Sequence, residues 1–153
     1  SHDDDSPEKI LWLKERNVGL SEFPVNMETA RTAREQKVQT LLGSPNVLRG
    51  VSQANNLNAR EAIAQGYGDI LCSDYAPMTL LHAIFTLVVL ELKSLPEAVR
   101  MASLNPARGV GIDQRTGSIE IGKAADLILV GNNNHFPRIQ RVYVNGREVY
   151  RTC

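Results

Sequence analysis

Short apolar runs alternate with longer amphipathic segments along the first two thirds of the chain. Residues 18–23, 38–42 and 70–72 are extended runs bounded by Gly, Pro, Asn or Asp, which is typical of strands. A polar loop is expected at residues 47–57. Capping residues and composition predict helices at residues 7–17, 27–36, 58–65, 78–93 and 95–103, with a last short one at 105–109. This alternation of strands and helices indicates a parallel sheet.

The run Ile70 to Cys72 is the most informative of these strands because it ends at a carboxylate, Asp74. A continuous apolar run of this length is typical of a strand covered by helices on both sides. In a (β/α) barrel the carboxyl end of each strand faces the active site, so Asp74 is a candidate for holding a metal or moving a proton. The alternative is that Asp74 caps a helix that starts near Pro77.

The last third of the chain changes to strand-like patterning. Ile119, Ile121 and residues 127–130 have strand character, and Asn145-Gly146 predicts a two-residue hairpin turn. Residues 131–134 are expected to form a mobile loop. We therefore expect two domains: a partial (β/α) barrel at residues 1–112, and strands of a small β-sandwich at residues 113–153, too few to stand alone.

Charge and composition narrow the possible partners. The 153 residues include 17 basic and 17 acidic side chains, so no net field favours nucleic acid or an anionic membrane. The longest apolar stretch, 80–92, is shorter than the roughly 20 residues that a membrane-spanning helix requires. Two cysteines and an acidic start without a signal-peptide pattern fit a cytoplasmic protein. Small molecules or further copies of the chain are the expected partners.

Several motifs resemble the amidohydrolase superfamily in order and spacing. They are residues 103–108 (Ser-Leu-Asn-Pro-Ala-Arg), 117–119, 122–127 (Gly-Lys-Ala-Ala-Asp-Leu) and 144–149 (Val-Asn-Gly-Arg-Glu-Val). Four more resemble the branch that hydrolyses alpha-D-ribose 1-methylphosphonate 5-triphosphate to the 5-phosphate and diphosphate in phosphonate degradation. These are residues 1–4, 21–24, 43–50 and 73–75. The resemblance implies a metal-dependent (β/α) barrel joined to a small β-sandwich.

The resemblance also implies roles for individual residues. Asp74 matches the carboxylate that contacts the metal and accepts a proton from the attacking water, and His2 matches a metal ligand. The implied cofactor is a divalent cation, zinc or manganese. His2 could instead belong to a frayed acidic terminus. The substrate-binding residues implied for a phosphorylated small molecule are Glu22, Asn46, Arg49, Ser52, Gln53 and Tyr75.

Residue 53 departs from the pattern of this branch. The branch loop usually continues Gly-Ser-His-Ser-Gly-Asn, whereas residues 51–56 read Val-Ser-Gln-Ala-Asn-Asn, so Gln53 stands in place of a histidine. Glutamine is a poor metal ligand and is no acid or base near neutral pH. The alternative function is therefore an amidohydrolase that cleaves a non-peptide C–N bond, in a cyclic amide or an N-acyl group.

The length of the chain fits only part of such a barrel. A (β/α)8 barrel typically takes about 250 residues, so this sequence is expected to be the C-terminal half of the fold. We expect this chain alone to be inactive and to bind metal weakly or not at all. Its open strand edges should pair with another copy or with a missing N-terminal half. A catalytically silent half-barrel that associates in this way is the non-enzyme alternative.

Overall fold

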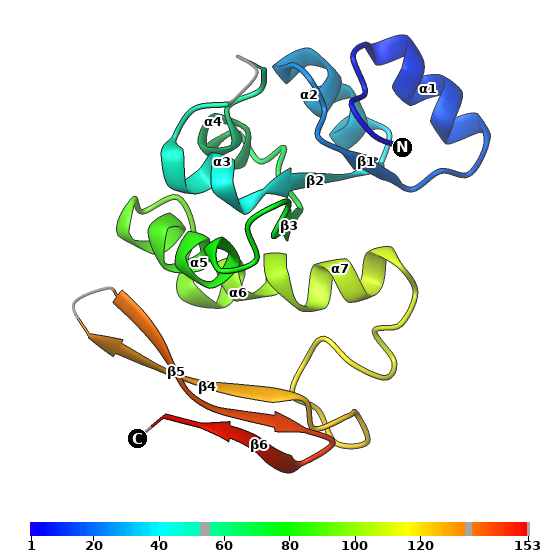
Figure 1. Ribbon diagram of the computed structural model, residues 1–153. Coiled ribbons are helices and arrows are strands. Elements are labelled where there is room, and N and C mark those ends of the chain that lie inside the picture. Colours follow the sequence, from blue (N-terminus) through cyan, green and yellow to red (C-terminus); the bar gives the residue numbers. More distant parts are fainter. Residues whose placement is uncertain (53–55, 134–135, 153) are drawn as a thin grey trace.

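The chain folds into two three-stranded sheets with helices around the first and between the two (Figure 1). The computed structural model describes residues 1–52, 56–133 and 136–152. Strands β1 (Leu20–Glu22), β2 (Gln39–Gly43) and β3 (Ile70–Cys72) are parallel and adjacent in that order. The mixed α/β architecture, with a helix after each parallel strand, fits a partial TIM-barrel-like domain.

Seven helices are found in the described part of the chain, and most begin where their capping residues predict. The side chains of Ser6, Asn26 and Asn58 accept hydrogen bonds from backbone N–H groups in the first turns of α1, α2 and α4. The helices are α1 (Pro7–Glu15), α2 (Met27–Glu35), α3 (Ser44–Arg49), α4 (Ala59–Ala64), α5 (Thr79–Val89), α6 (Leu95–Ala102) and α7 (Leu104–Gly109).

Helix α3 corrects the prediction of a polar loop at residues 47–57. Pro45 lies in the first turn, where it needs no backbone N–H, and Val47 is fully buried. Gly50 ends the helix with φ +75°, and the Arg60 guanidinium donates to the carbonyls of Val47 and Leu48 at 2.7 Å. Burial and these long-range bonds stabilise a helix that its turn-rich sequence alone does not indicate.

The antiparallel sheet contains β4 (Leu127–Asn133), β5 (Phe136–Val144) and β6 (Arg147–Arg151). The predicted Asn145-Gly146 turn is confirmed, with φ +50° and +76°. The predicted mobile loop at 131–134 is wrong for residues 131–133, because their backbone pairs with residues 136–138. Residue 134 lies outside the described residues.

The strand character predicted for Ile119 and Ile121 is wrong, because neither residue lies in a strand. Gly117 and Gly122 flank them with φ +93° and +92°, a left-handed conformation that interrupts an extended run. Both isoleucines are left exposed. The antiparallel sheet therefore begins only at Leu127.

The two faces of the parallel sheet are covered unequally. Leu42 and Leu71 are buried on one face in the main core with residues from α2 to α6. On the other face, Leu20 and Leu41 are only half-buried, and α7 approaches at Gly109. A half-covered second face of this kind fits the inward face of an incomplete barrel.

Helices α5, α6 and α7 lie between the parallel sheet and the antiparallel sheet in Figure 1. Helices α6 and α7 contact β3, and α5 contacts β5. Among the described residues, no helix has the length and apolar character needed to cross a membrane.

Candidate functional site

A cleft of about 180 Å³ opens at the carboxyl ends of the parallel strands. Its walls come from the segments that follow β1, β2 and β3 and from the stretch that precedes α1. In parallel α/β folds this end of the sheet carries the ligand site. Its lining residues include Asp3, Phe23, Gly43, Arg49, Ser52 and Asp74.

A larger cleft of about 730 Å³ lies between α6, α7 and the start of β4, but its chemistry is less specific. Its lining is mostly apolar, and Asp126 is the one carboxylate among its described lining residues. Asp126 already accepts a hydrogen bond from the Asn145 N–H at 2.8 Å. The smaller cleft, which holds two carboxylates and an arginine, is therefore the candidate active site.

The backbone turns sharply at the edge of this smaller cleft. Asp3, Phe23 and Asp74 have φ values of +50°, +55° and +51°. Phe23 directly follows β1, Asp74 lies just beyond β3, and Asp3 follows an isolated bridge between His2 and Glu22. A left-handed conformation costs a non-glycine residue on the order of 1–3 kcal/mol and is concentrated at functional sites. All three residues line the cleft.

Asp74 presents its carboxylate to the cleft and does not cap a helix. Helix α5 begins only at Thr79, and its N-cap residue is Met78. Asp74 Oδ1 accepts the N–H of Tyr75 at 2.8 Å. A Cβ placed on Gly43 would lie 3.2 Å from Asp74 Oδ2, so the glycine leaves room for this carboxylate. The helix-cap alternative for Asp74 is therefore wrong.

Arg49 lies in the last turn of α3 and faces the same cleft. Its Nη1 donates to the hydroxyl of Tyr75, next to Asp74 in the chain. An arginine has five N–H donors in a planar fork that matches phosphate oxygens. Because only one of them has a partner among the described residues, the guanidinium can still bind an anion.

Asn46 and Ser52 also line the cleft, with different freedom to bind a ligand. Asn46 Nδ2 donates to the Leu57 carbonyl at 2.9 Å, and its Oδ1 accepts the Ala59 N–H at 3.1 Å. These bonds tie α3 to the start of α4 and use Oδ1 and one of the two Nδ2 hydrogens, so the second Nδ2–H is the donor available for a phosphate. Ser52 is half-buried in the wall, and Gln53 lies outside the described residues.

His2 and Glu22 lie next to each other, but outside the described lining of the cleft. They form a parallel bridge in which Glu22 N–H donates to Ser1 O and Asp3 N–H to Glu22 O, both at 2.9 Å. The His2 ring is more than half exposed, with Nδ1 2.9 Å from an Asp3 oxygen, and it packs edge-on against Phe23. The acidic terminus is thus a paired edge segment in this structure.

The described residues do not complete a metal site. They contain no group of three or more His, Cys, Asp or Glu side chains placed to hold a cation. A catalytic zinc typically takes three protein ligands and a water. His2 and Asp74 therefore supply part of a site at most, and no catalytic step can be derived through a metal from this chain.

Asp3 is the one charged residue in the described lining of the cleft that the sequence motifs do not predict as a site residue. It lies one residue beyond a strand pair that no local pattern indicates. The bridge between His2 and Glu22 joins residues 20 positions apart and has no local pattern. The signal in the sequence that points to Asp3 is its position directly after His2, a residue that the family resemblance places at a strand end.

Cys72 ends β3, and its environment disfavours the thiolate. Burial is the main cause, and the negative charges of Glu22 and Asp74 add to it, which together raise the pKa of the thiol to about 11. The thiol should therefore be a poor nucleophile at neutral pH.

We expect iodoacetamide to modify Cys72 at pH 7.5 at least tenfold more slowly in the folded protein than in urea. A Cys153→Ser background isolates this thiol, and mass spectrometry of the peptide measures it. Equal rates in the folded and unfolded protein would show that the end of β3 is open to solvent and the thiol unperturbed.

Comparison with known proteins identifies the family of the chain. The profile described as "Amidohydrolase family" matches residues 2–149. The chain belongs to this family, whose members are hydrolases, and the resemblance noted from its motifs is confirmed.

One relative matches almost the whole chain. Over 98% of this chain and 40% of the relative, the sequence is 34% identical to alpha-D-ribose 1-methylphosphonate 5-triphosphate diphosphatase of Escherichia coli (strain K12). This chain thus spans well under two thirds of that relative.

Solved structures agree on the fold. A prolidase complexed with N-methylphosphonate-L-proline matches 99% of this chain and 44% of its own, with a TM-score of 0.69 and 18% identity. An adenosine deaminase from Xanthomonas campestris with bound zinc matches 84% of this chain and 36% of its own, with a TM-score of 0.58 and 18% identity. At these identities the likeness shows the fold alone.

Proposed function

We propose that this chain is the C-terminal half of a (β/α)8 barrel hydrolase with the adjoining β-sandwich strands. The complete protein would hydrolyse alpha-D-ribose 1-methylphosphonate 5-triphosphate to the 5-phosphate and diphosphate. The observation that carries the proposal is the placement of the Arg49 guanidinium and the Asp74 carboxylate in one cleft at the strand ends. The similarity to the diphosphatase over 98% of the chain supports it.

The two charged residues suit different parts of this reaction. Hydrolysis of a phosphate anhydride needs a cation for the phosphate oxygens and a base for the attacking water. Arg49 provides the cation on the last turn of a helix whose position the Arg60 bonds stabilise. Asp74, exposed on the cleft wall, would accept the proton from the water.

The remaining predicted residues would surround the substrate. Tyr75 orients Arg49 through its hydroxyl, while Ser52 and Asn46 line the same cleft. Glu22 and Gln53 are proposed as further contacts. His2 and Asp74 would contribute to a divalent cation site, zinc or manganese, completed by residues that this sequence does not contain.

The complete protein should be tested with two substrate classes. Diphosphate release from the ribose triphosphate supports the proposal. Hydrolysis of a cyclic amide or N-acyl compound, without diphosphate release, would overturn it and assign the cleft to a C–N bond hydrolase. The two outcomes are told apart by phosphate-anhydride and ammonia or amine assays on the same preparation.

Arg49→Ala in the complete protein should raise KM for the triphosphate by about 10- to 100-fold. This corresponds to the loss of about 1.5–3 kcal/mol from a hydrogen bond between charged groups. Initial-rate kinetics measure the change, and kcat should fall less than kcat/KM.

Arg31→Ala is the matched control, because Arg31 is an exposed arginine on α2 that makes one ion pair, with Glu35 at 3.7 Å. Its KM should stay within twofold of the wild-type value. If Arg49→Ala and Arg31→Ala gave the same KM, Arg49 would have no role in phosphate binding.

A further inference from the structure

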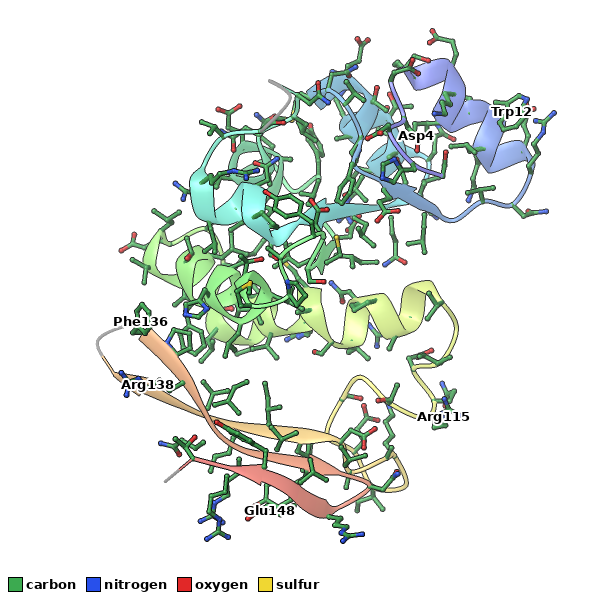
Figure 2. The ribbon with its side chains drawn as sticks, in the orientation of Figure 1. Asp4, Trp12, Arg115, Phe136, Arg138 and Glu148 are labelled. Carbon is green, nitrogen blue, oxygen red and sulfur yellow. The ribbon has the colours of Figure 1, made fainter. Side chains whose placement is uncertain are left out.

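A fully buried carboxylate, Asp4, directly follows the cleft residue Asp3 in a chain start that looks solvent-exposed by sequence. Figure 2 shows it beside α1. Its Oδ1 accepts the hydroxyl of Ser1 at 2.5 Å, its Oδ2 accepts the hydroxyl of Ser21 at 2.6 Å, and Lys9 Nζ lies 3.0 Å from Oδ1. A buried carboxylate is retained only when it is paired in this way.

The ammonium group of Lys9 also bonds the backbone of the two residues that precede Asp4. Lys9 Nζ donates to the carbonyl of His2 at 3.4 Å and to the carbonyl of Asp3 at 3.3 Å. Three consecutive residues, His2, Asp3 and Asp4, thus surround one cation. Lys9 itself lies in the first turns of α1, a helix packed through Ile10 and Leu13.

Asp4 also links this turn to the neighbouring strand β1 and to the segment that follows it. Its side chain bonds Ser21 in the middle of β1, and its carbonyl accepts the Val25 N–H at 2.9 Å beyond the strand. Asp3, between His2 and Asp4, has the left-handed φ of +50° and lines the cleft. The bonds of Asp4 therefore fix a turn that would relax if it were unrestrained.

We propose that Asp4 is a positioning residue for the cleft. Its buried carboxylate, together with Lys9, holds the left-handed turn that places Asp3 in the cleft wall and His2 beside it. Asp4 does not touch the substrate. The effect on turnover rests on the proposed function of the cleft, whereas the effect on the turn does not.

The test compares Asp4→Asn with Asp69→Asn in the complete protein. Asp69 is a matched control because its carboxylate also bonds the parallel sheet. It lies directly before β3, at the end of this strand that is away from the cleft. Its Oδ1 accepts from Arg34 at 3.1 Å and its Oδ2 from the Thr40 N–H at 3.0 Å. Both variants remove one charge at nearly constant shape, and both should lower thermal stability.

Only Asp4→Asn should change the cleft. We expect kcat to fall at least tenfold at a temperature where both variants remain folded. The Asp3 amide, which donates to Glu22 O, should exchange its hydrogen at least tenfold faster than in the wild type. Asp69→Asn should keep kcat within twofold and leave the exchange of this amide unchanged. If Asp4→Asn does not fold, Ser21→Ala, which leaves the charge in place, should show the same changes at smaller size.

Two results would overturn the proposal. One is an Asp4→Asn variant with wild-type turnover and wild-type exchange at Asp3, and the other is equal loss in both aspartate variants. A wild-type protein without diphosphatase activity would contradict the proposed function instead. In that case hydrogen exchange at Asp3 still decides the role of Asp4.

Discussion

Replacing Asp74 by Asn in the complete protein should lower kcat by about 10²- to 10⁴-fold, the usual contribution of a positioned general base. The carboxylate is exposed to the cleft, and its one hydrogen bond among the described residues is from the adjacent Tyr75 N–H. An amide oxygen can accept that same bond, so the local turn should persist. What the substitution removes is the negative charge and the ability to accept a proton.

The structure makes this a selective test of chemistry. Asp74 does not cap α5. The free energy of unfolding of the variant should therefore stay within about 0.5 kcal/mol of the wild-type value, as is usual for surface substitutions. Asp69→Asn, at the other end of β3, should show the reverse: reduced stability with wild-type turnover. Steady-state kinetics and thermal melts on both variants give the comparison. A wild-type kcat for Asp74→Asn would refute the assignment of Asp74 as the base.

The elements that the sequence predicted correctly are those specified by local chemistry. Ser6, Asn26 and Asn58 fixed three helix starts, because each side-chain oxygen bonds a backbone N–H two or three residues further on. The Asn145-Gly146 turn was equally local, since a type I′ turn needs two residues with positive φ. In both cases the residues that specify the conformation lie within the turn or within the first turn of the helix.

The errors arose where distant contacts decide the conformation. Helix α3 is specified by the burial of Val47 and by the bonds from Arg60, neither of which is visible in residues 43–50 themselves. Conversely, Ile119 and Ile121 have the alternation of a strand but find no partner strand between two left-handed glycines. Periodicity indicates which side chains could be buried, and pairing determines whether they are.

The candidate site was predictable only where local sequence marks its residues. Asp74 and Arg49 were found because a strand end and a family motif mark them, and the structure brings both to one cleft. Asp3 and Asp4 were not assigned roles, because an acidic start looks like a solvated tail. Their positions depend on the bridge to Glu22 and on Lys9 and Ser21.

The 153-residue chain alone is expected to show no hydrolase activity, even with added zinc or manganese. Three parallel strands and one bridge are described, whereas a closed barrel takes eight strands. Leu20 and Leu41, on the less covered face of the parallel sheet, are only half-buried, and the described residues hold no group of three metal ligands.

The open edges of the parallel sheet should also pair with strands of another chain. We therefore expect light scattering to show a dimer or a larger assembly of the 153-residue chain.

The decisive measurement compares the chain with the complete protein at equal concentration and metal. If the missing barrel strands supply the other ligands, the complete protein should bind metal tightly and turn over, while the chain alone should do neither. Mixing the chain with a separately expressed N-terminal half should restore part of the activity, because both open edges can then be paired. Turnover by the chain alone that disappears in Asp74→Asn would instead show that this half of the fold is sufficient for catalysis.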